Sequence, residues 1–312
     1  MKSFLRYAAI PVIRAVIVAA GVSFLAFALL EAAPSDSAEM IAIARYGAFG
    51  FSEQMVQNIR DEEGFNSPLA IRYVRWAAHI IRGDFGNSIV RLTPVARELW
   101  PRTASTLLLA STSMAVTLLA ALPLGIAPGI WPGSKTGKLL DFCSAAAASL
   151  PQFWLGNLLI LIFAVSLSWL PTAGDEGLLT LILPAMSIAI VQVPWTASLL
   201  RAALLNGSHA VHVCAARARG ISRCGILFRH VLRPALAPVI AILGVQFAVL
   251  LEGAVIVETV FARPGLGRLA VDSVVARDFP VLLACVVTIG VVTTAASTLA
   301  SFFQKWLDPR IH

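Results

Sequence analysis

The stretch from residue 235 to residue 259, ALAPVIAILGVQFAVLLEGAVIVET, is long and apolar enough to cross a membrane as a single helix. A helix needs about 20 predominantly apolar residues to span roughly 30 Å of bilayer hydrocarbon. Similar runs recur through the rest of the chain, at about 10–30, 104–127, 140–165, 178–203 and 281–304. The pattern predicts an all-α polytopic membrane protein with six transmembrane helices.

The composition supports a chain that is solvated largely by lipid. The sequence is 58% hydrophobic and only 13% charged, with a mean hydropathy of +0.82. The net charge of +7 would suggest nucleic acid as the partner of a soluble protein. In a membrane protein the placement of Lys and Arg carries more meaning than their sum. We therefore expect membrane lipid, and no nucleic acid, as a partner.

The distribution of bases predicts the orientation of the spans. The segment between the fourth and fifth runs holds several arginines and no acidic residue, and the loop after the second run holds Lys135 and Lys138. Short basic loops stay in the cytoplasm. The loop after the third run carries Asp175 and Glu176 without a base, so it is expected outside. Six spans then place both termini in the cytoplasm.

The predicted organisation has one membrane domain and no soluble domain large enough for an enzyme. Residues 1–103 form the first helix and a long external excursion, 104–304 form a five-helix core, and 305–312 form a cytoplasmic tail. The first run could instead be a cleaved secretory signal. Its removal would leave five spans and place the termini on opposite faces, so a retained anchor is the better interpretation.

The chain lacks the residue patterns of catalysis. The stretch GSKTGKL at 133–139 has three residues between its glycines and Leu139 after the lysine, whereas a P-loop needs four residues and a Ser or Thr. No HExxH or GxSxG motif occurs, and the cysteines show no CxxC or metal-ligand spacing. We expect no catalytic residue, no metal and no cofactor bound by this chain.

The most informative segment is 209–234. Together with Ala235 it reads HAVHVCAARARGISRCGILFRHVLRPA. Small side chains at Ala215, Ala216 and Ala218 permit close packing against a partner, and Gly220 permits the turn that ends a short helix. The surrounding arginines could pair with acidic groups of a cytosolic protein. The alternative is a plain cytoplasmic loop that obeys the positive-inside rule.

The segment also resembles the cytoplasmic loop of permease subunits of ATP-binding-cassette importers, in the dipeptide, oligopeptide and nickel branch. That loop reads EAA, three residues, Gly, nine residues and then I-x-L-P, and here Cys214 replaces the glutamate. Ordered matches elsewhere are GDFGNS at 83–88, SLPQFWLG at 149–156 and ETVFARPGLGRLAVDSVVARDFP at 258–280. The resemblance covers nearly the whole chain and implies a type I importer permease fold with a cytoplasmic coupling helix.

The resemblance also implies the partners and the residues that meet them. A second, homologous permease, two cytosolic ATPase subunits that bind ATP and Mg²⁺, and an external substrate-binding protein would complete the importer. The loop at about 204–233 would couple ATP hydrolysis to transport through Cys214, Ala215, Ala216, Arg217, Ala218, Arg219, Gly220, Arg229, Leu232 and Arg233. His230 and Arg233 stand where the general motif has Ile and Pro, which departs from it. Peptides are the expected cargo, with nickel or a metal chelate as the alternative.

Polar residues inside the apolar runs are the remaining candidates. Glu258 matches the family motif and is expected to support the external loop with Pro264, Gly265 and Gly267 through hydrogen bonds to backbone amides. Glu252, where the branch usually has glycine, could line the path for a cationic substrate or pair with a base of the second permease. Gln192 and Gln246 could also line the path, or could join helices by hydrogen bonds.

Glu252 is also the one feature that favours an ion-coupled secondary transporter. An intramembrane enzyme would need more than these two acids.

Overall fold

The computed structural model describes residues 13, 16–17, 19–29, 32, 37–47, 50–62, 64–130, 135–175, 177–208 and 210–307. Within these ranges the chain is helical, and its β-structure is limited to an isolated bridge between Asn87 and Pro94. The predicted all-α class is confirmed.

The chain divides into two compact units, which are described separately. Unit 1 comprises residues 1–104 and 265–292, and unit 2 comprises residues 105–264 and 293–312. Unit 1 contains α2 (Ser37–Tyr46), α3 (Glu53–Glu62), α4 (Leu69–Ile81), α12 (Leu266–Val275) and the first parts of α5 (Val95–Ile130) and α13 (Phe279–Leu307). Unit 2 contains the rest of α5 and α13 with α6 (Lys135–Ser149), α7 (Gln152–Leu159), η1 (Ile160–Ser166), α8 (Leu179–Ser208), α9 (Val211–Ala218), α10 (Arg223–Ile226), η2 (Leu227–Val231) and α11 (Leu232–Val260).

Four described helices are long and apolar enough to cross a membrane: Val95–Gly129, Leu179–Ser208, Leu227–Leu251 and Phe279–Phe303. They match the predicted second, fourth, fifth and sixth runs. The predicted first run at 10–30 is described only in part, as a shorter apolar helix at Ala19–Leu29. Its remaining residues lie largely outside the described ranges.

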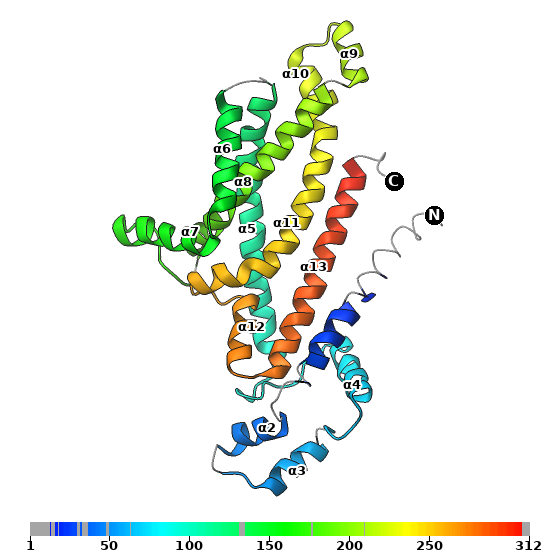
Figure 1. Cartoon of the computed structure of the whole chain (residues 1–312), viewed down its shortest axis with the longest axis vertical. Coiled ribbons are helices and arrows are strands. Elements are labelled where there is room, and N and C mark those ends of the chain that lie inside the picture. The colour runs from blue at the N-terminus through cyan, green and yellow to red at the C-terminus, as the bar shows by residue number, and fades with distance from the viewer. Residues whose placement is uncertain are drawn as a thin grey trace. The chain divides into compact units, whose positions relative to one another are not determined.

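The third run, predicted as one span at 140–165, is not one straight helix. The structure has a helix at Lys135–Ala147 and a second at Gln152–Ser166, bent by 103° with respect to each other. Figure 1 shows α7 turning away from the direction of α6. Pro151 has no N–H to continue the hydrogen-bond ladder, and a proline disfavours helical backbone at the residue before it, here Leu150. Both constraints act at the position of the break.

Close helix contacts organise unit 2 around α8, which packs against α6 and α11 (Figure 1). A side chain at Gly125 would place its Cβ 2.7 Å from the carbonyl oxygen of Ala197, and one at Gly129 would lie 2.9 Å from Leu204 Cδ1. The two glycines form a GxxxG spacing on α5, which lets helices approach closely inside a membrane. The α5–α8 contact therefore requires small residues at both positions.

The loop between α4 and α5 is fastened within unit 1 to the turn between α12 and α13. The buried carboxylate of Asp278 accepts hydrogen bonds from the Ser88 hydroxyl and, at 3.2 Å, from the Ile89 N–H. Buried apolar residues of α5, α12 and α13, among them Leu99, Leu269 and Val281, form the neighbouring core. This fastening fixes one wall of a cavity described below.

Candidate functional site

The predicted coupling segment forms the short helix α9, which is anchored by one face. Val213 and Ala216 are buried in a core shared with Leu200 and Leu204 of α8 and with Ile226. The side chains at 213 and 216 lie three positions apart, so they fall on the same face of the helix. Burial of that face holds α9 against the membrane helices. The opposite face of α9 is therefore exposed.

A glycine-dependent turn ends α9. Gly220 has a φ of +76°, and its N–H donates to the Arg217 carbonyl at 3.0 Å, while the Ile221 N–H donates to the Ala216 carbonyl at 3.3 Å. This pair of bonds is the Schellman arrangement, which satisfies carbonyls that a helix end would leave unpaired. The predicted role of Gly220 in ending a short helix is thus seen directly in the backbone.

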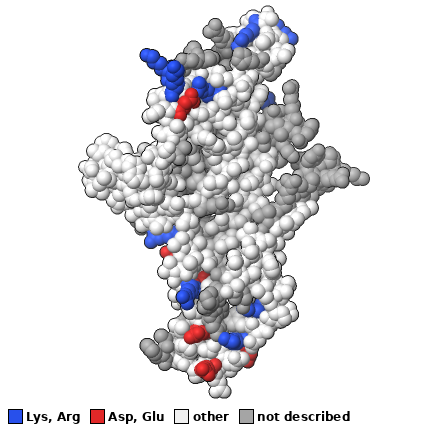
Figure 2. Space-filling model, viewed as in Figure 1, with Lys and Arg blue, Asp and Glu red and all other residues white. Residues whose placement is uncertain are grey.

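The outward face of α9 combines small and basic side chains. Ala215 and Ala218 are exposed together with Cys214, Arg217 and Arg219. Figure 2 shows basic side chains at the tip of this segment. Exposed alanines let another backbone come close, and the guanidinium groups can pair with carboxylates. The surface has the properties expected for docking an acidic partner.

The remaining residues of the predicted coupling loop lie beyond α9. Arg229 is exposed in the π-helix η2, and Arg233 is exposed in the first turn of α11. Leu232 is partly buried and packs beside the core that anchors α9. Part of the loop therefore serves as anchor and part remains on the surface.

Glu258 is completely buried near the end of α11, and it joins two helices. Its Oε1 accepts a hydrogen bond from Thr106 Oγ1 of α5 at 2.5 Å. Its backbone carbonyl accepts the N–H of Arg263 at 2.8 Å, which closes the turn after α11. A buried carboxylate needs such donors because desolvation without them is costly.

Arg263, at that turn, is a second buried ionic group. Burial lowers the pKa of Arg263 from its ordinary value, and the carboxylates of Asp175 and Glu258 oppose that shift. Beside it, Pro264 is partly buried, and Gly265 and Gly267 are buried at the start of α12. The support of this loop by the Glu258 carboxylate remains a prediction, since the turn bond to Arg263 is made by the backbone carbonyl of Glu258.

Two of the three predicted path residues, Gln192 and Gln246, take part in helix–helix hydrogen bonds. The buried Gln246 exchanges bonds with Thr196 of α8 at 3.4 and 3.5 Å, and Gln192 accepts one from Thr117 of α5 at 3.5 Å. Glu252 lies in α11, but its side chain is outside the described set. The assignment of these three residues to a path stays a prediction.

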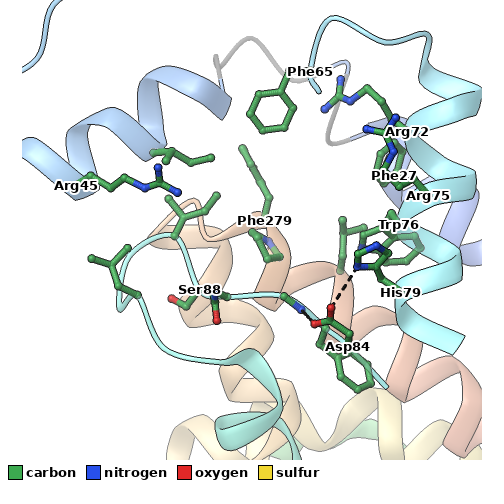
Figure 3. A pocket seen from close by; sticks show the side chains of 18 residues that line it. Phe27, Arg45, Phe65, Arg72, Arg75, Trp76, His79, Asp84, Ser88 and Phe279 are labelled. Carbon is green, nitrogen blue, oxygen red and sulfur yellow. Dashed lines mark hydrogen bonds and ion pairs between the residues drawn. The ribbon is translucent and has the colours of Figure 1, made fainter. Parts of the chain in front are cut away.

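Sequence reasoning missed a cavity of about 480 Å³ in unit 1. Figure 3 shows Arg72, Arg75, Trp76 and His79 reaching into it from α4. The other walls come from the apolar helix Ala19–Leu29, α2, the turn between α3 and α4, the loop after α4 and the start of α13, segments far apart in the sequence. The only sequence signal was the alternation of aromatic and basic residues along α4, which by itself also fits an ordinary amphipathic helix.

The comparison with known families settles the class of protein. The family described as "Binding-protein-dependent transport system inner membrane component" matches residues 121–312, more than half of the chain. The chain belongs to this family. This chain is therefore a multi-pass transport permease, as the resemblance over nearly the whole chain implied.

Curated relatives match this permease over most of its length. It is 34% identical over 302 residues to the oligopeptide transport system permease protein AppB of Bacillus subtilis, covering 93% of this chain and 94% of the relative. A probable peptide ABC transporter permease protein of Sinorhizobium fredii is 34% identical over 302 residues, covering 94% and 95%. The glutathione transport system permease protein GsiC of Escherichia coli K12 is 36% identical over 263 residues, covering 84% of each.

A solved structure shares the fold of the permease. The crystal structure of an amino acid ABC transporter with histidines superposes with a TM-score of 0.52 at 20% identity, covering 67% of this chain and 94% of the other. This likeness confirms the expected importer permease fold.

Proposed function

We propose that this permease forms, with a second homologous permease, the path by which an ATP-binding-cassette importer takes up peptides. Two separate ATPase subunits bind ATP and Mg²⁺ and dock on α9, while this chain binds neither. An external binding protein delivers the cargo, and both termini lie in the cytoplasm. Family membership and the peptide-transport names of the relatives support this assignment.

The outward face of α9 is the observation that carries the coupling role. A segment anchored by Val213 and Ala216 moves with α8 and α11, because their side chains share one core. Force applied to the exposed Ala215 and Arg217 would therefore be transmitted to both membrane helices. ATP-driven closure of the docked subunits would use this connection to switch the access of the path.

Peptide cargo is favoured over nickel or a metal chelate by the relatives, whose names refer to oligopeptides, peptides and glutathione. Specificity rests on interactions that distinguish one ligand from another. The cavity of unit 1 supplies cationic and aromatic walls and therefore suits an organic anion better than a metal cation.

The docking role is tested with Ala215→Trp, which places a large side chain on the exposed face while leaving the buried anchor untouched. The matched control is Ala276→Trp, at an exposed alanine that ends α12 in unit 1. We expect Ala215→Trp to reduce the ATPase subunits recovered with the complex by about tenfold, the effect of losing a well-packed interface contact. The control should retain them.

Peptide uptake into ATP-loaded proteoliposomes is measured on the same preparations. Loss of uptake with Ala215→Trp and normal uptake with Ala276→Trp supports the proposal. Equal recovery of ATPases and equal uptake for both variants would overturn the assignment of α9 as the docking element. A wild-type complex that never associates with an ATPase would overturn the importer function as a whole.

A further inference from the structure

The cavity of unit 1 has the walls of a small-ligand site. Its volume of about 480 Å³ falls within the range of roughly 300–1,000 Å³ that is usual for such sites. Aromatic rings of Phe27, Phe65, Trp76, Phe85 and Phe279 line it, and Figure 3 shows Phe65, Phe279 and Trp76 on different sides. These rings offer contact area for an apolar group at little cost in side-chain entropy.

The rings are held in place by contacts outside the cavity. Phe27 and Trp76 lie 5.7 Å apart between ring centroids, and both contact Tyr73. The hydroxyl of Tyr73 donates to the Ala20 carbonyl at 3.1 Å and bonds Ser23 at 2.9 Å. These contacts fasten α4 to the apolar helix Ala19–Leu29. The aromatic wall is therefore positioned in advance of any ligand.

Cationic groups dominate the polar part of the lining. Arg45, Arg72 and Arg75 contribute guanidinium groups, against the single carboxylate of Asp84. Arg72 stacks over the Phe65 ring at 4.8 Å, and Arg45 lies 3.9 Å from Glu62. Arg75 makes no hydrogen bond or ion pair with another described residue. Guanidinium groups bind carboxylates through two parallel hydrogen bonds, so this side of the cavity suits a carboxylate.

An anionic side chain lies on another part of the lining. Asp84 accepts the Gly86 N–H at 3.0 Å and contacts His79 Nδ1 at 3.2 Å. The hydrogen bond from the Gly86 backbone, followed by that from His79, lowers the pKa of Asp84 below its ordinary value. Figure 3 shows Asp84 and His79 together, apart from Arg45. An ionised carboxylate there can accept an ammonium group.

We propose that this cavity binds a short peptide with an apolar side chain and a free carboxylate, holding it in the permease itself. The arginines receive the carboxylate, the aromatic rings receive the side chain, and Asp84 receives the ammonium group. The choice of peptide rests on the proposed function. The cavity is then a cargo site of the extracytoplasmic segment, in addition to whatever site the binding protein supplies.

The test measures binding to the permease complex in nanodiscs without the external binding protein. The probe is radiolabelled alanyl-phenylalanine, compared with its C-terminal amide, in equilibrium dialysis. Arg75→Gln removes one cationic group of the cavity. Arg82→Gln is the matched control, because Arg82 ends the same helix, is exposed and does not line the cavity.

Wild type should bind the free acid about tenfold more tightly than the amide, the usual effect of a hydrogen bond to a charged group. Arg75→Gln should abolish that preference while Arg82→Gln keeps it. A wild-type complex that binds neither form, or binds both equally, overturns the inference. So does an equal loss with both variants.

Failure of this inference is distinguishable from failure of the proposed function. Uptake of the same dipeptide is measured with the binding protein restored. Normal ATP-driven uptake without binding in the dialysis assay overturns the cavity site alone and leaves the importer function standing. Absence of uptake and of ATPase association overturns the proposed function, whereas the dialysis result still decides whether the cavity takes the peptide.

Discussion

Thr106 gives a hydroxyl donor to a carboxylate that is fully buried, so one nearly isosteric change can test the pair. Thr106→Val keeps the shape of the side chain and removes one hydrogen bond that the buried Glu258 carboxylate accepts. We expect the free energy of unfolding to fall by about 1–3 kcal/mol, the range for removing one partner of a buried hydrogen bond. Denaturant unfolding of the purified permease in detergent measures this change.

The control for that experiment lies on the same helix. Thr112 is only partly buried, and its hydroxyl donates to the Leu108 carbonyl at 2.7 Å within its own helix. Thr112→Val should change the free energy of unfolding little, because no buried group loses a partner. If both variants lose equal stability, the Thr106–Glu258 bond contributes no more to the free energy of unfolding than an ordinary bond within a helix. The loop at Arg263 must then be supported by other contacts.

Residue types could be singled out from the sequence, but their partners could not. Glu258 was identified because a carboxylate in an apolar run needs compensation. Its donor Thr106 is 152 positions away, and the Ser88–Asp278 bond joins residues 190 positions apart. Only the fold brings such groups together. The amides of Gln192 and Gln246 join helices through their hydrogen bonds with Thr117 and Thr196, while their place on a path stays a prediction.

At the scale of an element, the end of α9 depends on backbone that glycine adopts without strain. Gly220 has a φ of +76°, and no atom lies within 4 Å of a Cβ added there. A larger residue would therefore meet no steric clash, but it would have to adopt left-handed backbone. Gly220→Ala should destabilise the turn by about 1–2 kcal/mol, the cost of left-handed backbone for an L-residue with a Cβ. Gly220→Asn should cost less, since Asn visits this region more readily. Faster hydrogen exchange at residues 211–226 measures the effect.

Gly253 provides the matched glycine control. It lies inside α11 with ordinary helical backbone and no atom within 4 Å of an added Cβ. Gly253→Ala should leave exchange at 211–226 unchanged, and it should favour the helix slightly because alanine has the higher helix propensity. Equal acceleration of exchange by both variants would show that the Schellman turn does not hold α9.

Elements themselves were predictable where hydrophobic length decides, and less so where backbone chemistry intervenes. The runs at 178–203 and 281–304 became α8 and α13 with ends close to those expected. The run at 140–165 forms two helices bent by 103° and not one straight helix, with the break at Leu150 and Pro151. Apolar composition is uniform across that break, so hydropathy alone cannot locate it.

For the molecule as a whole, the sequence predicted the fold class and the family but not the cavity. Its walls come from the helix Ala19–Leu29, α2, α4, two loops and the start of α13, whose mutual placement depends on long-range packing. The predicted excursion before residue 104 holds the short helices α2, α3 and α4. A long excursion carries little topological information, because long segments cross the membrane largely regardless of their charge.

Orientation in the membrane is the whole-molecule property that labelling can decide. The charge pattern predicts that α9 faces the cytoplasm and that α4 lies outside. Two single-cysteine proteins test this, each with Cys143→Ser, Cys224→Ser and Cys285→Ala. One keeps the exposed Cys214 of α9, and the other carries Cys214→Ser with Ala70→Cys, at an exposed position of α4.

A membrane-impermeant maleimide applied to intact spheroplasts should label the protein with Ala70→Cys and leave Cys214 unlabelled. Cys214 should react only after the membrane is permeabilised, because the basic segment around it stays on the cytoplasmic side. Labelling of Cys214 in intact spheroplasts would reverse the topology. The face of α9 could then not meet cytosolic ATPases, and the cavity beside α4 could not meet cargo from outside. Labelling of both positions from the same side would contradict the odd number of membrane crossings predicted between residues 70 and 214. The helices α5 to α8, which form those crossings, would then have to be reassigned.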